Sequence, residues 1–297
     1  MGQADIPFVE KWAIDEGFYP GRGDLLTYFH ADPAGSMVGC LNGRPIGCIV
    51  GARFDNSYGF IGLFLVIPEQ RGHGYGLALW KRALRHLDGL TCIGLEAAPR
   101  RQNDYASWGF KSAFNTLRWC LDAAAGGNRT LCSRAPLPPG FCLLPGSQVS
   151  EAAIQSYDAK HEATPRPLFL REWLQTNQGN QGSAWSDTVT VLLDELGCCR
   201  GFARIRPCLP TISGKLTWRL GPWLADASAL AGVLLDDLCS QRQGEIIVDA
   251  PEANPRAYRL LEERGFKATD RTIRMYRGHE PSFALHDVYG LTCLELG

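Results

Sequence analysis

Residues 70–76 read Gln-Arg-Gly-His-Gly-Tyr-Gly and separate two segments of different character. The preceding run, 60–66, is almost wholly apolar, which is typical of a central strand buried on both faces. The following segment, 76–88, predicts an amphipathic helix, because large apolar side chains recur three and four residues apart at Leu77, Trp80, Leu84 and Leu87. A buried strand, a glycine-rich turn and a helix in this order predict a mixed α/β fold.

The composition of the turn at 70–76 suits the binding of a pyrophosphate. Glycine at alternate positions permits positive φ angles, so several backbone N–H groups can converge on one anion. The helix behind the turn adds unpaired N–H groups, and the guanidinium of Arg71 can bind a phosphate in two places. A plain strand-to-helix turn remains the alternative. The spacing differs from the G-x-G-x-x-G of a dinucleotide-binding unit, and no Gly-Lys-Ser/Thr follows as in a P-loop.

Length and composition describe an ordinary globular chain. The 297 residues, 45% hydrophobic and 21% charged, favour two domains and exclude a disordered or fibrous chain. A formal net charge of -1 gives no general attraction to nucleic acid or to an anionic membrane, and no apolar run is long enough to span a bilayer. The 11 cysteines include no C-x-x-C pair and no zinc-like cluster with His, so we expect reduced thiols, no metal site and a cytoplasmic location.

The chain divides near its middle, where residues 123–147 carry a Gly-Gly, a Pro-Pro and further turn residues without periodicity. We therefore expect domains at 1–125 and 148–297, joined by a linker at 126–147 that few contacts cross. Both parts show the order strand, turn, helix, strand, helix, Gly-Phe, strand. In the second part the turn is expected at Gly221-Pro222-Trp223, before a helix at about 226–240. This internal duplication predicts two related domains.

The turn at 70–76 matches the phosphate loop Gln/Arg-x-x-Gly-x-Gly/Ala of the GNAT acetyltransferases, and the sequence resembles that family over nearly its whole length. Tyr105 stands four residues before Gly109-Phe110, where the family often has a Tyr that acts on the cofactor sulfur. The resemblance, which extends to a bacterial tandem-GNAT subgroup, implies two GNAT-like domains. Each would hold a mostly antiparallel sheet, with a splayed central strand and flanking helices.

The resemblance implies transfer of an acetyl group from acetyl-CoA to the amine of a small molecule, by direct attack in a ternary complex. Strand 60–67 would splay from its neighbour and pair with the pantetheine arm, and a backbone N–H beside the splay would polarise the thioester carbonyl. The expected cofactor-binding residues are Leu65, Val66, Gln70, Arg71, Gly72, His73, Gly74, Tyr75, Gly76 and Asn103.

The resemblance also suggests how protons are handled. Tyr105 is the expected proton donor to the leaving thiolate, although its ring could simply pack on the helix. No general base stands out. Glu96, at the end of the strand predicted at 91–97, and Glu16 and Asp24, in the early helix–loop region, are the candidates, and a water chain is the alternative.

The second half resembles the same family less closely. Asn254-Pro255-Arg256-Ala257, followed by Gly265-Phe266, resembles the family's late motif. The loop at 220–226 has neither the Arg nor the glycine repeat, Pro222 has no N–H, and Asp226 is an anion where a phosphate would lie. Leu261 stands where a Tyr would be expected. We expect this domain to keep the fold without a CoA site of its own.

Charge in the first 35 residues bears on the acceptor. Six acids stand there against two bases, which favours a cationic acceptor if the segment lines the acceptor site, although a solvated helix face would look the same: Asp5, Glu10, Asp15, Glu16, Asp24 and Asp32. No nucleic-acid or membrane partner is expected, and the sequence does not give the oligomeric state. A non-catalytic acyl-CoA sensor on the same scaffold is the alternative function.

Overall fold

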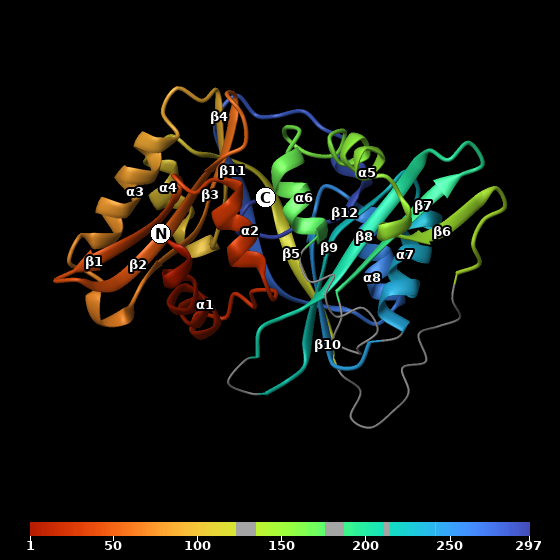
Figure 1. The fold of residues 1–297 in the computed structure, drawn as a ribbon, viewed down its shortest axis with the longest axis horizontal. Coiled ribbons are helices and arrows are strands. Elements are labelled where there is room, and N and C mark those ends of the chain that lie inside the picture. Colours follow the sequence, from red (N-terminus) through yellow and green to blue (C-terminus); the bar gives the residue numbers. More distant parts are fainter. Residues whose placement is uncertain (123–134, 176–186, 211–213, 241) are drawn as a thin grey trace.

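The structure is a computed structural model that describes residues 1–122, 135–175, 187–210, 214–240 and 242–297. Its first half, on the left in Figure 1, follows the predicted order of elements closely. The β1–β2 hairpin turns at Asn42 and Gly43, whose φ angles of 50° and 77° an Asn-Gly turn readily adopts. The helices and strands are α1 (Ile6–Asp15), α2 (Asp24–Ala31), β1 (Ser36–Leu41), β2 (Arg44–Arg53), β3 (Tyr58–Val66), α3 (Tyr75–His86), β4 (Cys92–Ala97), α4 (Gln102–Ala106) and β5 (Lys111–Leu121).

The second half repeats the order, with two differences from the sequence-based expectation. Residues Phe141–Pro145, expected to be linker, form a strand that pairs with the next one along the chain. The turn expected at 221–223 is wrong, because Gly221, Pro222 and Trp223 lie inside a strand. The elements are β6 (Phe141–Pro145), α5 (Glu151–Asp158), α6 (Pro167–Gln175), β7 (Thr188–Asp194), β8 (Cys199–Pro207), β9 (Thr217–Ala225), α7 (Ser228–Ser240), β10 (Glu245–Pro251), α8 (Pro255–Glu263), β11 (Lys267–Gly278) and β12 (Val288–Gly290).

The strands form one 12-stranded sheet in the order β1-β2-β3-β4-β11-β5-β10-β9-β8-β7-β6, with β12 paired to β9. Each half gives one strand to the other: β11 lies between β4 and β5, and β5 lies between β11 and β10. Figure 1 shows these two strands running between the halves. Backbone ladders therefore join the halves, contrary to the expectation of few contacts between them. The sequence did not predict this exchange, because β5 and β11 carry similar patterns and pair with strands that are distant in the sequence.

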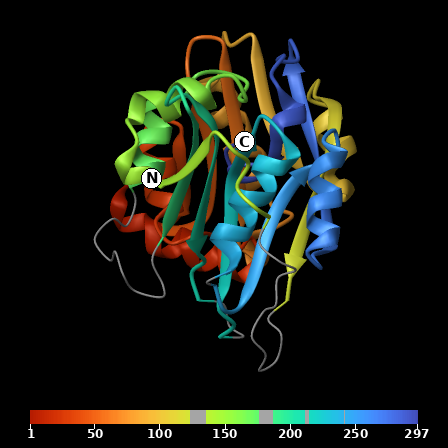
Figure 2. The ribbon, with the colours of Figure 1, turned by 90° about the vertical axis from the view of Figure 1, so that its right-hand side faces the viewer.

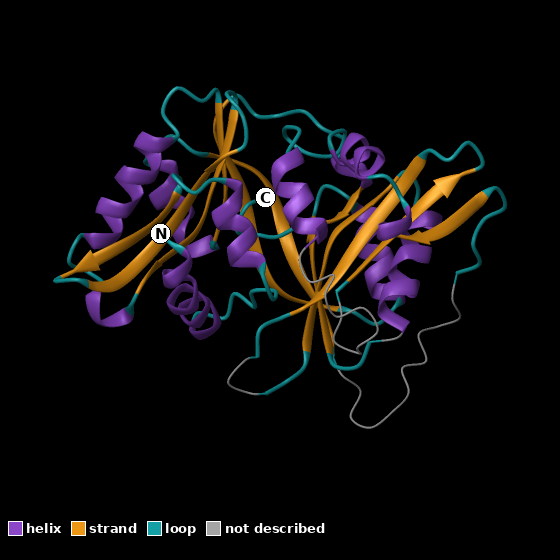
Figure 3. Cartoon of the chain, in the orientation of Figure 1, coloured by secondary structure: helices purple, strands orange, loops and turns teal. Residues whose placement is uncertain are grey.

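Helices cover both faces of this sheet (Figures 2 and 3). α3 packs on one face of the first half, around Trp80, and α7 packs on the same face of the second half, around Leu234. The opposite face carries α1, α2, α5 and α6 in a single apolar cluster that includes residues of both halves. The tail after β12 joins that cluster through Leu291, Cys293 and Leu296, so the chain ends between the halves.

Candidate active site

β3 and β4 run parallel but are paired only where β3 begins. Their ladder ends at Ile61 and Leu95, although β3 continues to Val66 and β4 to Ala97. On its other edge β3 forms a bulge against β2, and Leu63 within it has a φ of 48°, which is uncommon for a leucine. A bulge increases the local twist and redirects backbone groups. The predicted splay is therefore present, and Leu65 and Val66 lie on its open part.

The glycine-rich loop 70–76 lies where the splay opens, between β3 and α3. Gly72 and Gly74 have φ angles of 80° and 85°, and a β-carbon on either would meet no atom within 4 Å. Gly74 precedes the first turn of α3, which no side chain caps. Backbone N–H groups in a first helical turn have no acceptor within the helix, so they can bind an anion. The loop thus has the open backbone that the sequence predicted.

Arg71, expected to bind phosphate, forms hydrogen bonds with Val66 and Glu16 of the chain itself. Its Nε donates to the carbonyl oxygen of Val66 at 2.8 Å, and its Nη2 is paired with the carboxylate of Glu16. The two side chains are 50% and 29% exposed, and ion pairs this close to solvent contribute up to about 1 kcal/mol. The predicted base Glu16 is therefore engaged, and the edge of the Arg71 guanidinium that carries Nε and Nη2 is occupied.

Tyr105 lies on α4 and packs against α3. Its ring centroid is 5.2 Å from that of Trp80, and the ring shares an apolar cluster with Phe64 and Val66 of the splayed strand. Burial raises the pKa of the Tyr105 phenol, so the group keeps its proton at neutral pH. This state suits a proton donor to a thiolate. Asn103 lies exposed on the same helix.

Glu96 is the first residue of β4 beyond the ladder with β3, and it lies directly opposite Arg274 of β11. The Nε of Arg274 donates to its Oε1 at 2.7 Å, and the hydroxyls of Thr116 and Thr272 donate to the carboxylate at 3.1 and 2.7 Å. Both side chains of the ion pair are at most 3% exposed. Glu96 therefore lies at the splay as expected, but three donors already hold the carboxylate proposed as a base.

The acids of residues 1–35 do not form a free acidic patch. Glu10 is half-buried, and burial together with the nearby Asp24 raises its pKa. The other five bind groups of the chain itself: Asp5 accepts from the Gly2 N–H, Asp15 pairs with Lys11, Glu16 with Arg71, Asp24 with Arg206, and Asp32 with His86. Most of these carboxylates are thus bound within the chain, and a cationic acceptor stays a prediction.

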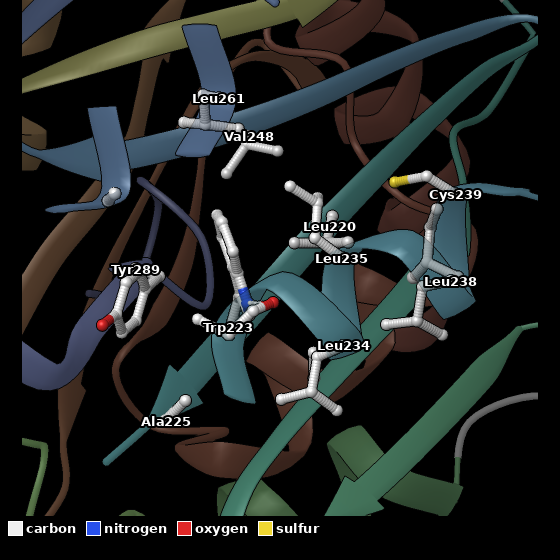
Figure 4. Packing of buried hydrophobic residues seen from close by; sticks show 14 of the residues in the cluster. Leu220, Trp223, Ala225, Leu234, Leu235, Leu238, Cys239, Val248, Leu261 and Tyr289 are labelled. Carbon is white, nitrogen blue, oxygen red and sulfur yellow. Dashed lines mark hydrogen bonds between the residues drawn. The ribbon is translucent and has the colours of Figure 1, made fainter. Parts of the chain in front are cut away.

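Strands β9 and β10 of the second half also splay apart, but β12 fills the gap between them. The parallel ladder of β9 and β10 ends at Leu220 and Val248, and a bulge at Gly221-Pro222 follows. Strand β12 then pairs with Trp223 and Leu224 of β9, while the N–H of Leu291 donates to the carbonyl of Asp249 on β10 at 2.8 Å. Figure 4 shows Tyr289 of β12 beside Trp223. The edge where pantetheine would pair is occupied.

The tail after β12 crosses from the second splay to the first. A β-carbon on Gly221 would overlap the carbonyl oxygen of Leu291, and one on Gly62 would overlap that of Glu295. The two glycines are equivalent, since each directly follows the last paired residue of its splayed strand. The tail therefore lies against both splays, on the face of the sheet opposite α3.

Neither a metal-binding cluster nor a membrane-spanning helix is found within the described residues. No group of three or more His, Cys, Asp and Glu side chains is arranged to hold a metal ion. No helix in the same ranges is both long and apolar enough to cross a membrane.

Comparison with known proteins finds a family match for each half. The acetyltransferase (GNAT) family model matches residues 6–110, and an acetyltransferase (GNAT) domain model matches residues 154–290. The chain belongs to the GNAT acetyltransferases. It is a tandem GNAT protein and an acyltransferase.

Relatives with similar sequences or folds cover most of this tandem GNAT chain. A holothin acyltransferase from Pseudoalteromonas sp. (strain SANK 73390) is 28% identical over 291 residues, which are 97% of this chain and 90% of that protein. A protein from Pyrococcus horikoshii, provisionally described as an acetyltransferase, has a similar structure with a TM-score of 0.77 and 19% identity, over 100% of this chain and 94% of that one. A tandem GNAT protein from the clavulanic acid biosynthesis pathway has a TM-score of 0.60 and 16% identity, over 93% and 94%.

Sequence reasoning missed Arg274, the partner of Glu96 in this GNAT site. A signal was present: Thr116-Leu117-Arg118 and Thr272-Ile273-Arg274 repeat the pattern Thr-x-Arg in the two exchanged strands. Arg118 also faces an acid of the other half, since its Nε and Nη2 donate to the two carboxylate oxygens of Asp249 at 2.7 and 3.0 Å. Each half thus supplies an arginine that pairs with an acid of the other, and Asp249 is also paired with Arg219 of its own half.

Proposed function

We propose that this chain transfers an acetyl group from acetyl-CoA to the amine of a small molecule, at the splay of its first half. The observation that carries the proposal is the contrast between the two splays. The one beside Val66 has an open edge that leads to the exposed loop 70–76, whereas β12 fills the one beside Trp223. The relative named as a holothin acyltransferase supports a small molecule as the acceptor.

In this proposal the open edge of β3 pairs with the pantetheine arm. The backbone N–H groups of residues 71–76 hold the pyrophosphate, together with Arg71 once it leaves Glu16. The bulge at Leu63 turns a backbone N–H toward the thioester carbonyl and stabilises the negative charge that develops on its oxygen. Tyr75 and Gly76 begin α3, so the helix N-terminus faces the same anion.

The chemical step forms one bond and breaks another. The amine nitrogen attacks the thioester carbonyl carbon, the C–S bond breaks, and the thiolate takes a proton from Tyr105. The proton that the nitrogen loses on becoming an amide returns to the Tyr105 phenolate through water. An alkyl ammonium with a pKa of about 10.4 must first lose a proton. Since Glu96 and Glu16 are held in ion pairs, water leading to the surface is the proposed acceptor of that proton.

The second half has a structural role in this proposal. It supplies β11 with Arg274, and its tail covers Gly62 on the acceptor side. One acetyl-CoA per chain is therefore expected. The ten described cysteines are free thiols, which fits the proposed cytoplasmic location, where acetyl-CoA is made and used.

Calorimetric titration of acetyl-CoA tests the cofactor site. Gly74→Asp adds a negative charge and a side chain to the loop, so we expect binding to weaken by more than about tenfold, from one site per chain. Gly89→Asp is the matched control, because Gly89 has a similar φ of 81° and equally open surroundings beyond the far end of α3. Release of free thiol with a panel of primary amines then tests transfer. Absence of binding in the wild type would overturn the proposal, and binding without any transfer would favour the sensor.

A further inference from the structure

The side of α3 that faces solvent carries positive charge only. Lys81, Arg82 and Arg85 are exposed there, and α3 contains no acid. Residues four apart lie on the same side of a helix, so Lys81 and Arg85 form a row that Leu77, 48% exposed, continues toward the N-terminus. None of the three cations forms an ion pair with a described residue. These four side chains, here called the α3 face, are therefore free to meet an anionic partner.

The corresponding helix of the second half, α7, has the opposite character. It contains Asp236 and Asp237 and no Lys or Arg. The chain itself covers it: the guanidinium of Arg264 on α8 donates to both carboxylate oxygens of Asp236, and the backbone N–H of Ala135 donates to one of them. A free cationic helix face therefore occurs in the half whose splay is open, and a covered helix with acids occurs in the half whose splay β12 fills.

The place of the α3 face beside the loop 70–76 limits what that partner can be. Helix α3 begins at Tyr75, inside the loop, and Leu77 lies in its first turn. In the proposed function the thioester lies in the splay and the phosphate end of the pantetheine arm lies at this loop. The group attached to that phosphate therefore lies beside the first turns of α3. In acetyl-CoA the group is a nucleotide, and in a protein that carries phosphopantetheine it is the protein surface.

The charge and composition of the α3 face favour a protein over a nucleotide. Beyond its pyrophosphate, CoA offers a single further phosphate, whereas α3 presents three unpaired cations and an exposed leucine. A row of cations that ends in an apolar side chain complements a protein surface on which carboxylates surround an apolar contact. Surfaces of opposite charge also raise the rate of association, by about 10- to 1,000-fold.

We propose that the α3 face docks an acidic carrier protein, which delivers the acyl group as a thioester on its phosphopantetheine arm. This step rests on the proposed function, because the arm uses the same open splay. The amine nitrogen bonds to the acyl carbon, the C–S bond breaks, and the arm keeps its sulfur as a thiol with the proton donated by Tyr105. The proton that the nitrogen loses returns to Tyr105 through water. Acetyl-CoA and the loaded carrier are thus alternative donors for one reaction.

The experiment measures the Kd of three donors by calorimetry. They are acetyl-CoA, acetyl-dephospho-CoA, which lacks the 3′-phosphate, and a small acidic acyl carrier protein loaded with acetyl-phosphopantetheine. The double variant Lys81→Glu/Arg85→Glu reverses the charge of the row. Arg259→Glu/Lys267→Glu is the matched control, because it changes the net charge equally at two exposed residues of the second half that form no ion pair with a described residue. Arg82→Glu, a single change on the α3 face, serves if the first variant does not fold.

We expect the loaded carrier to bind the wild type, and the reversal on α3 to weaken this binding by about tenfold or more, the lower end of the effect of complementary charge. The Kd of acetyl-CoA should change by less than about threefold, because exposed charges away from its phosphates are screened by salt. The control should leave the Kd of the carrier unchanged.

Three results would overturn the docking proposal but not the proposed function. The first is acetyl-CoA binding without carrier binding by the wild type. The second is an equal loss for the carrier in the control variant. The third is a loss for acetyl-CoA as large as that for the carrier but absent for acetyl-dephospho-CoA, which would assign the α3 face to the 3′-phosphate. Binding of the carrier without binding of acetyl-CoA would overturn acetyl-CoA as the donor and keep the docking face, and binding of neither would overturn both.

Discussion

Glu96 of β4 and Arg274 of β11 face each other across the ladder that joins the two halves, with Nε and Oε1 2.7 Å apart and both side chains buried. Removing one charge of a buried pair leaves the other without compensation, at a cost of about 3–5 kcal/mol. We expect Arg274→Met to lower the free energy of unfolding by that amount. Glu96→Gln in the same chain should recover a large part of it. Urea denaturation of both single variants and the double variant measures this coupling, and additive effects would contradict the pairing.

Tyr105 is predicted to donate a proton to the leaving thiolate. Tyr105→Phe should lower kcat by about a hundredfold, the lower end for loss of a general acid, with little change in the Kd of acetyl-CoA. Tyr258→Phe is the control, because Tyr258 is a partly buried tyrosine of the corresponding helix in the second half whose hydroxyl has no described partner. Steady-state rates and calorimetry decide the matter, and an unchanged kcat would reduce Tyr105 to a packing residue.

Glu16 competes with a phosphate for Arg71. Glu16→Gln should release the guanidinium and tighten acetyl-CoA binding by about two- to fivefold, because a pair this exposed contributes at most about 1 kcal/mol. Asp15→Asn, at the residue before Glu16, breaks the exposed pair with Lys11 instead and should leave the Kd unchanged. Calorimetry reports both values, and weaker binding after Glu16→Gln would mean that the pair holds the loop in its binding shape.

Gly62 and Gly221 both lie against the tail. A methyl group on either would overlap a tail carbonyl, so Gly62→Ala and Gly221→Ala should each cost about 1–3 kcal/mol of stability. Gly62→Ala should also lower kcat/KM by more than its unfolded fraction accounts for, since Gly62 adjoins the bulge of the open splay. Gly221→Ala should lower kcat/KM only by its unfolded fraction. Thermal melts and rates below the melting temperature separate these effects. Equal activity losses would place both splays in catalysis.

Glu162 makes stability depend on pH. Burial raises its pKa to about 7, with Arg166 and Arg274 opposing the shift and Asp158 adding to it. The folded chain therefore binds this proton more tightly than the unfolded chain, and the associated stability, fully present below about pH 4.5, is lost as pH rises through about 7. Glu162→Gln cannot ionise, so its melting temperature should fall less than that of the wild type between pH 5.5 and pH 8. Glu172→Gln, with a side chain 43% exposed, is the control and should follow the wild type. A parallel fall of Glu162→Gln and wild type would refute the assignment.

Local pattern was enough to predict much of the first half. The apolar run before Pro68, the glycines of the loop and the spacing of Trp80 and Leu84 each depend on neighbours close in sequence, and β3, the loop and α3 lie where these signals indicate. In the second half, the local pattern at Gly221-Pro222 led to a wrong prediction of a turn. Those two residues resemble a turn, whereas in the fold they form the bulge of a buried strand that β8 holds on one edge.

By itself the sequence determined the duplicated order of elements, the glycine-rich loop and the family, because these are set by composition and spacing over short stretches. Only the tertiary structure showed that β5 and β11 are exchanged between the halves, that β12 fills the second splay, and that Glu96 forms an ion pair with Arg274. Each of these depends on backbone groups or charges that meet from distant parts of the chain. Once the exchanged strands pair, an acid and an arginine about 180 residues apart become neighbours, and burial makes their pairing obligatory.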